Sequence, residues 1–203
     1  MIKIVIFDFD GVIVNSTKHN IDFANQMLKH FGKPELSRGD EKDAYTMTSR
    51  EFYNKYLYDV GIIRSLFFMK RLFKKTLNEF KATKHLNKLL KILKKKYKLA
   101  IVTNRAGETY EILEYLGLRD NFDLILTVEH IKKPKPSPEG IKKVLKYFTF
   151  KPSEAVYIGD TSFDSLAAKR AGVISIILKN RKDGGDYKIK DLFDIKGILE
   201  KFK

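Results

Sequence analysis

Two aspartates close the first apolar segment of the chain. The run 2–7 is followed by Asp8 and Asp10, with Phe9 between them. Alternate side chains of an extended segment point the same way, so the two carboxylates are expected on one side and Phe9 on the other. Like charges held this close repel each other unless a cation or a shared proton relieves the repulsion. The pair therefore predicts a metal site, a general acid, or both.

Polar side chains also follow three later apolar segments. They are Thr103 and Asn104 after the second segment, Lys135 in a proline-rich stretch after the third, and Asp160 and Asp164 after the fourth. Ligands of open α/β sheets bind beyond the carboxyl ends of the strands, where these groups are expected to meet. Magnesium prefers oxygen ligands, usually one or two carboxylates with water and phosphate, and a lysine supplies a second cation. The set therefore predicts phosphoryl transfer.

Four short segments carry a family resemblance. They are D-F-D-G-V-I-V-N-S from Asp8, T-N from Thr103, K-P-S-P from Lys135 and G-D-T-S-F-D from Gly159. In this order they resemble the four motifs of the haloacid dehalogenase superfamily over nearly the whole chain. The chain resembles the phosphoglycolate phosphatase branch in particular, with a helical cap between motifs one and two. This resemblance implies a phosphatase that hydrolyses a small phosphorylated metabolite through an aspartyl-phosphate, with Mg²⁺ as cofactor.

The resemblance also implies catalytic roles. Asp8 is expected to be the nucleophile that attacks phosphorus. Asp10 is expected to protonate the leaving oxygen and later to activate water. The phosphoryl oxygens are expected to be bound by Thr103, Asn104 and Lys135.

The implied metal ligands are the four aspartates of the motifs. Asp8 and Asp160 are expected to bind through their carboxylates, and Asp10 through its backbone carbonyl. Asp164 is expected either to bind through a metal-bound water or to orient Lys135. The dehalogenases of the superfamily lack the second aspartate, so Asp10 indicates phosphate esters as substrates.

Several of these residues also have a purely structural interpretation. Asp8 and Thr103 are residue types that cap turns and helices. Asp164 is an acid near an expected helix start, which the helix dipole favours without any catalytic role. Lys135 has the alternative of a solvated lysine in a proline-rich turn.

Arg50 is the candidate for gripping the rest of the substrate. The stretch T-S-R-E around it resembles a cap loop of sugar-phosphate mutases, although an Arg before a Glu at a helix start is also common surface decoration. A phosphomutase on the same scaffold is therefore an alternative function. A nucleic-acid-binding protein is another, because the net charge of +15 favours anionic partners.

Composition limits the remaining possibilities. The chain of 203 residues has no cysteine, which excludes disulfides and thiolate metal sites. No apolar stretch approaches the ~20 residues of a membrane span, and Asp8 and Asp10 interrupt any signal-like segment. We expect a cytoplasmic protein without membrane partners, either a monomer or a small homo-oligomer.

The expected fold is α/β: a Rossmann-like parallel sheet sandwiched by helices, with an inserted all-helical cap. Apolar runs rich in Ile and Val predict buried strands at 2–9, 99–103, 124–127, 155–158 and 174–178. Amphipathic patterns predict helices at 82–96, 108–116, 138–148, 162–171 and 190–203. Further helices are expected at 16–31, 49–58 and 64–80. Residues 1–15 and 82–203 then form the core domain and 16–81 the cap, and 180–186 is expected to be a surface turn.

Overall fold

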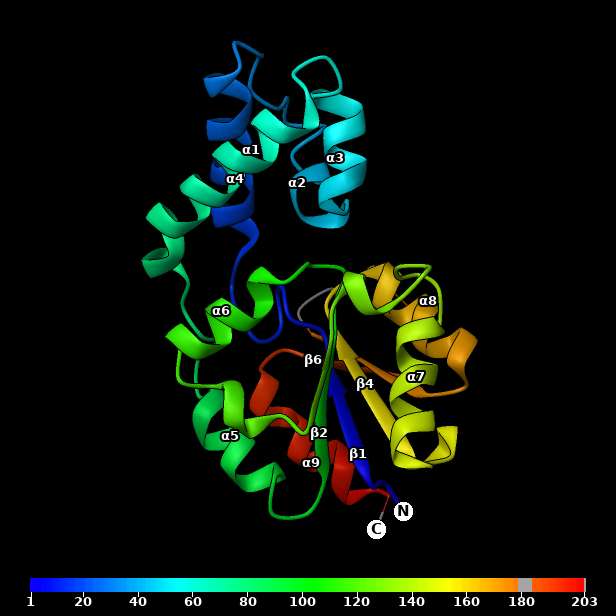
Figure 1. Ribbon diagram of the computed structural model, residues 1–203. Coiled ribbons are helices and arrows are strands. Elements are labelled where there is room, and N and C mark those ends of the chain that lie inside the picture. Colours follow the sequence, from blue (N-terminus) through cyan, green and yellow to red (C-terminus); the bar gives the residue numbers. More distant parts are fainter. Residues whose placement is uncertain (179–183, 203) are drawn as a thin grey trace. The chain divides into compact units, whose positions relative to one another are not determined.

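A computed structural model describes residues 1–178 and 184–202 of the chain (Figure 1). Its strands are β1 (Ile4–Phe7), β2 (Lys98–Val102), β3 (Leu124–Leu126), β4 (Ala155–Gly159), β5 (Ile174–Leu178) and β6 (Tyr187–Ile189). They form one sheet in the order β3-β2-β1-β4-β5-β6, and every neighbouring pair is parallel. The predicted α/β fold with a parallel sheet is confirmed.

The sequence prediction missed β6. This strand has three residues, of which only Ile189 is buried, so it lacks the apolar run that marks the inner strands. It pairs with β5 at the edge of the sheet. The predicted surface turn at 180–186 falls mostly on residues 179–183, which lie outside the described residues.

Helices flank the sheet on both faces. They are α5 (Leu86–Leu93), α6 (Glu108–Tyr115), α7 (Glu139–Phe148), α8 (Ser162–Ala171) and α9 (Ile195–Glu200). Figure 1 shows α7 and α8 on one side of the sheet and α5, α6 and α9 on the other. Short 3₁₀ segments lie at Leu77–Glu79, Arg119–Asn121, Val128–His130, Pro152–Glu154 and Leu192–Asp194.

Two helices are shorter than their sequence patterns predict. The pattern over 82–96 gives α5 only from Leu86, because His85 before it has a left-handed backbone with φ 62°. The pattern over 190–203 is divided, because the Asp191 carboxylate accepts a hydrogen bond from Phe193 N at 2.8 Å and starts a 3₁₀ segment ahead of α9. Apolar spacing thus located both elements but not their first residues.

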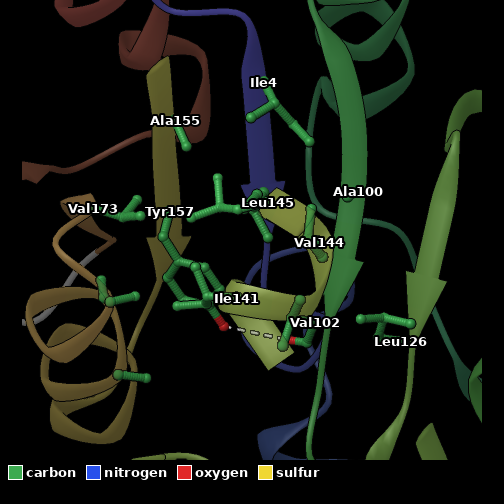
Figure 2. Packing of buried hydrophobic residues seen from close by; sticks show 14 residues of the cluster. Ile4, Ala100, Val102, Leu126, Ile141, Val144, Leu145, Ala155, Tyr157 and Val173 are labelled. Carbon is green, nitrogen blue, oxygen red and sulfur yellow. Dashed lines mark hydrogen bonds between the residues drawn. The ribbon is translucent and has the colours of Figure 1, made fainter. Parts of the chain in front are cut away.

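Both faces of the sheet are buried, as a parallel sheet requires. Ile4 and Ile6 of β1 face a cluster formed with α7 and α8, which Figure 2 shows around Tyr157. The leucines of α5 are all buried as well. Each fully buried side chain of this size stabilises the fold by about 1.5–3 kcal/mol, so these layers hold the strand ends in fixed positions.

The chain divides into two compact units. The core unit comprises Met1–Val14 with Ala82–Lys203, and the inserted unit comprises Asn15–Lys81. The inserted unit, all of which the structure describes, contains the helices α1 (Thr17–His30), α2 (Asp43–Thr46), α3 (Ser49–Tyr56) and α4 (Ile62–Thr76). Within the described ranges, no helix is both long and apolar enough to cross a bilayer.

The inserted unit has its own apolar centre. Met27, Leu28, Leu57 and Leu72 are buried together. The sequence prediction missed α2, a single turn whose Asp43 is buried and bonded to Lys55 at 2.6 Å. One helical turn has too few residues to produce a periodic pattern.

The order of the strands changes direction at β1. From β1 the chain adds β2 and then β3 on one side, and afterwards β4 and β5 on the other. A crevice at the carboxyl ends of the strands is expected at such a reversal. Asp8 lies there, directly after β1, and its backbone N donates to Ile158 O of β4 at 2.7 Å.

Candidate active site

Lys135 is the centre of a buried charged cluster at this edge. Its Nζ lies 2.7 Å from Asp8 Oδ1 and 2.6 Å from Asp164 Oδ1. It also donates to Tyr157 Oη at 3.1 Å, and that hydroxyl in turn donates to Val102 O (Figure 2). The side chain of Lys135 is only 5% exposed. A solvated turn lysine is therefore not what the structure contains.

Asp164 is fully buried and both of its oxygens are engaged. Oδ1 accepts from Lys135 Nζ and lies 3.1 Å from Tyr157 Oη, whose single proton has this oxygen and Val102 O as alternative acceptors. Oδ2 accepts from the backbone N of Asp160 and Thr161 and from the Thr161 hydroxyl, at 2.7–3.2 Å. Asp164 thus caps the start of α8 and holds Lys135 at the same time. Of its two expected roles, this geometry favours the orientation of Lys135.

Thr103 and Asn104, the residues of the second motif, lie beside Lys135. Asn104 Oδ1 accepts from Lys135 N at 2.8 Å, and Asn104 Nδ2 donates to Lys135 O at 3.1 Å. The Asn104 side chain therefore fixes the backbone of the lysine. Thr103 is buried at the end of β2, and its hydroxyl oxygen accepts from Arg105 N at 3.1 Å.

Asp10 is connected to the segment after β2 through Arg105. Arg105 Nε donates to Asp10 Oδ2 at 2.9 Å, and Arg105 Nη2 donates to Asp10 Oδ1 at 2.8 Å. Contacts therefore join the four motifs into one cluster. Sequence reasoning missed Arg105 and Tyr157 as members of it. The position of Arg105 directly after T-N was the one available signal, and Tyr157 read as an ordinary strand residue.

Burial controls the charge state of the carboxylates. It raises the pKa of Asp8 well above its usual value, although the neighbouring Lys135 opposes this effect. Burial and the charge of Asp164 raise the pKa of Asp160 to about 7. For Asp164 the effect of burial is outweighed by Lys135, which holds the pKa of that carboxyl below its usual value. At the carboxyl ends of β1 and β4, Asp8 and Asp160 therefore hold protons more tightly than free carboxyls do when no cation is bound.

The donor set fits a hard divalent cation. One carboxylate oxygen from each of Asp8, Asp160 and Asp164 lies within 4.8 Å of the other two. Asp8 Oδ1 is buried and, among the described residues, makes no directed hydrogen bond beyond its ion pair with Lys135. Carboxylate oxygens are the ligands that Mg²⁺ prefers. A cation would also relieve the repulsion that raises the pKa of Asp160.

Gly11 makes room for this arrangement. Its φ is +75°, and a Cβ atom there would lie 1.9 Å from Asp160 Oδ2. We expect Gly11→Ala to lose about 1–2 kcal/mol of stability from left-handed strain and about 1–3 kcal/mol more from overlap, measured by urea unfolding. Gly117→Ala is the matched control, because Gly117 has φ +64° and a Cβ atom there would have no described atom beyond its chain neighbours within 4 Å. Equal losses in the two variants would show that the overlap has no effect.

The remaining predicted site residue lies in the inserted unit. Arg50 is exposed near the start of α3, where Thr48 and Glu51 form a capping box. Its contact with substrate stays a prediction.

Comparison with known proteins agrees with the geometry. Residues 5–178 match the model of the haloacid dehalogenase-like hydrolase family. Pyrophosphatase PpaX from Bacillus mycoides is 26% identical over 98% of each chain. The crystal structure of a hydrolase of this superfamily from Geobacter sulfurreducens is 27% identical, covers 98% of this chain and 100% of its own, and has a TM-score of 0.82.

A second solved structure extends the likeness in fold. It is a predicted phosphoglycolate phosphatase from Haemophilus somnus, 23% identical over 98% of each chain, with a TM-score of 0.83. The match to the family model, together with the pyrophosphatase relative, confirms the sequence prediction at the level of family and enzyme class. The chain belongs to the haloacid dehalogenase-like hydrolase family.

Proposed function

We propose that the protein is a Mg²⁺-dependent phosphatase that hydrolyses small phosphate esters through an aspartyl-phosphate on Asp8. The observation that carries this proposal is the position of Asp8. Its carboxylate lies at the end of β1, 2.7 Å from the buried ammonium of Lys135, in a cluster with Asp160 and Asp164. A nucleophile, a fixed cation and a place for a second cation are the parts that phosphoryl transfer needs.

The reaction proceeds in two steps. In the first, an oxygen of Asp8 bonds to phosphorus, the bond from phosphorus to the leaving oxygen breaks, and Asp10 donates a proton to that oxygen. In the second, water gives a proton to Asp10 while its oxygen attacks phosphorus, which releases Asp8 and inorganic phosphate. Lys135 faces the negative charge of the transferred group, and Thr103 supports the same oxygens.

The carboxylates of Asp8 and Asp160 and the backbone carbonyl of Asp10 would hold the Mg²⁺ ion. When bound, the ion neutralises charge on the transferred group. Asp164 acts through Lys135, since both of its oxygens already accept hydrogen bonds. Asn104 acts in the same indirect way, because its amide holds the backbone of Lys135.

The substrate class is a small phosphorylated compound. Relatives named pyrophosphatase add inorganic pyrophosphate to the candidates. The inserted unit serves as a cap that excludes bulk water and selects the substrate, with Arg50 as a contact to its non-reacting part. Cap contacts set specificity in this proposal, while the core unit supplies the chemistry.

A phosphate-release screen tests the proposal. The panel contains pyrophosphate, phosphoglycolate, sugar phosphates and nucleotides, each with Mg²⁺ and with excess chelator. A phosphatase releases stoichiometric phosphate from at least one of them, only with the metal. Isomerised sugar phosphate without phosphate release would indicate a mutase instead. A salt-dependent gel shift with no turnover on the whole panel would favour a nucleic-acid-binding protein.

Magnesium affinity is expected to depend on pH through Asp160. With a pKa of about 7, this carboxyl must lose a proton to bind the ion, so affinity should rise about tenfold from pH 6 to pH 8. Calorimetric titration of Mg²⁺ at both values measures it. In Asp160→Asn most of the affinity should be lost, together with the part of the pH dependence that Asp160 contributes. Equal affinity of the unmodified protein at pH 6 and pH 8 would contradict the assignment.

The same pKa predicts how pH affects the metal-free protein. Asp160 has a folded-state pKa above its unfolded value, so between about pH 4 and pH 7 the folded state binds a proton that the unfolded state has lost. Stability without metal should therefore fall as pH rises through this window. At pH 8, Mg²⁺ at about 100 times its Kd should restore about 2.7 kcal/mol, measured by thermal unfolding.

A further inference from the structure

Arg105 grips the side chain of Asp10 with two hydrogen bonds. The bonds are 2.9 Å from Nε to Oδ2 and 2.8 Å from Nη2 to Oδ1, so each carboxylate oxygen receives one nitrogen of the same guanidinium edge. The two side chains are 17% and 22% exposed. A bidentate pair fixes the plane of the carboxylate as well as its distance, which a single ammonium cannot do.

The backbone of Arg105 is itself fixed on both sides. Its N–H donates to the Thr103 hydroxyl oxygen at 3.1 Å. Its carbonyl oxygen accepts from Val128 N, also at 3.1 Å. Arg105 therefore reaches Asp10 from a rigid point directly after β2. Asp10 lies in the turn after β1, where neighbouring Gly11 N donates to Val14 O.

We infer that Arg105 is the positioning residue for proton transfer by Asp10. The inference rests on the proposed function, in which Asp10 protonates the leaving oxygen. A proton donor contributes about 10²–10⁴-fold to rate when it is held at the right point. The guanidinium holds the ionised carboxylate by both oxygens in one plane. When Asp10 carries the proton, the protonated oxygen gives up its bond to Arg105 and the other oxygen keeps its bond, so the carboxyl group stays in place. Arg105 itself donates no proton to the substrate.

A comparison of two leaving groups tests the inference. An alkyl phosphate such as glycerol phosphate needs protonation of its leaving oxygen, whereas p-nitrophenolate leaves without it. We expect Arg105→Met to lower kcat on the alkyl ester about 100-fold and on p-nitrophenyl phosphate less than about 5-fold. Asp10→Asn should give the same selective pattern. Arg119→Met is the matched control, because Arg119 is a partly buried arginine over the Tyr110 ring and should leave both rates unchanged.

A second variant, Arg105→Lys, keeps the positive charge but removes the planar guanidinium that makes two hydrogen bonds. Arg105→Lys should still lose about 10-fold on the alkyl ester, because a single ammonium does not fix the carboxylate plane. It also serves as the test variant if Arg105→Met does not fold. Equal losses on both esters, or no loss on either, would overturn the inference while the proposed function stands. An unmodified protein that hydrolyses neither ester, nor any compound of the panel, would overturn both.

Discussion

Asp8→Asn is expected to abolish phosphate release while the fold is retained. An amide cannot displace the leaving group from phosphorus, so kcat should fall by about 10⁴-fold or more. The variant should unfold at the same temperature as the unmodified protein or above it. The reason is that burial, Asp160 and Asp164 disfavour the charged form of Asp8, and the neutral amide removes that repulsion. Lys135 keeps its ion pair with Asp164, so no buried charge is left without a partner.

Asp59→Asn is the control for this variant. Asp59 is an exposed aspartate bonded to Lys33 within the inserted unit, so its loss should leave the rate unchanged. Single-turnover measurement of phosphate release compares the three proteins. Release by Asp8→Asn within tenfold of the unmodified rate would exclude Asp8 as the nucleophile. A large drop in melting temperature would assign Asp8 a structural role instead.

Lys135→Met is expected to damage both activity and stability. The variant leaves the carboxylates of Asp8 and Asp164 buried without their cation. Removal of one partner of a buried ion pair costs about 3–5 kcal/mol, which corresponds to a fall in melting temperature of about 10 °C. Turnover should fall about 10³-fold, since the transferred group loses the cation that faces it.

The pH dependence of the stability of Lys135→Met distinguishes loss of the lysine charge from simple loss of packing. Without Lys135 the folded-state pKa values of the two carboxyls lie above their unfolded values, so the variant is least stable at neutral pH and recovers as pH falls. Urea unfolding at pH 5 and pH 7.5 measures the difference. Lys98→Met removes an exposed lysine paired with Asp123 and should lose less than about 1 kcal/mol. A pH-independent loss in Lys135→Met would contradict the electrostatic explanation.

Much of the architecture follows from short apolar runs. Strands buried on both faces need such runs, so β1, β2, β3, β4 and β5 were predictable, and the rule that ligands bind beyond strand ends located the carboxylates. The edge strand β6 was not predictable, because only Ile189 of it is buried. Arg105 was not predicted as a site residue because its partner Asp10 is 95 positions away, and only the folded backbone brings their side chains together.

Tyr157 was not predicted as a site residue for a different reason. Its ring belongs to the apolar cluster, while its hydroxyl is hydrogen-bonded within the charged network. A sequence pattern records the ring, which suits a buried strand, but not the direction of one oxygen atom. Which residues of the inserted unit would contact substrate was unpredictable in the same way, because surface side chains such as Arg50 follow no periodic rule.

Val14 has a consequence for how such proteins diversify. It forms one bridge with Asp10 and another, antiparallel, with Ala82. The 67 residues of Asn15–Lys81 thus leave and rejoin the sheet-bearing part at adjacent points. An inserted segment of another length or sequence can be grafted between such neighbouring ends without a change in the strands. With the proposed cap role, exchange of this segment would change substrate preference while the strand ends that carry the acids stay as they are.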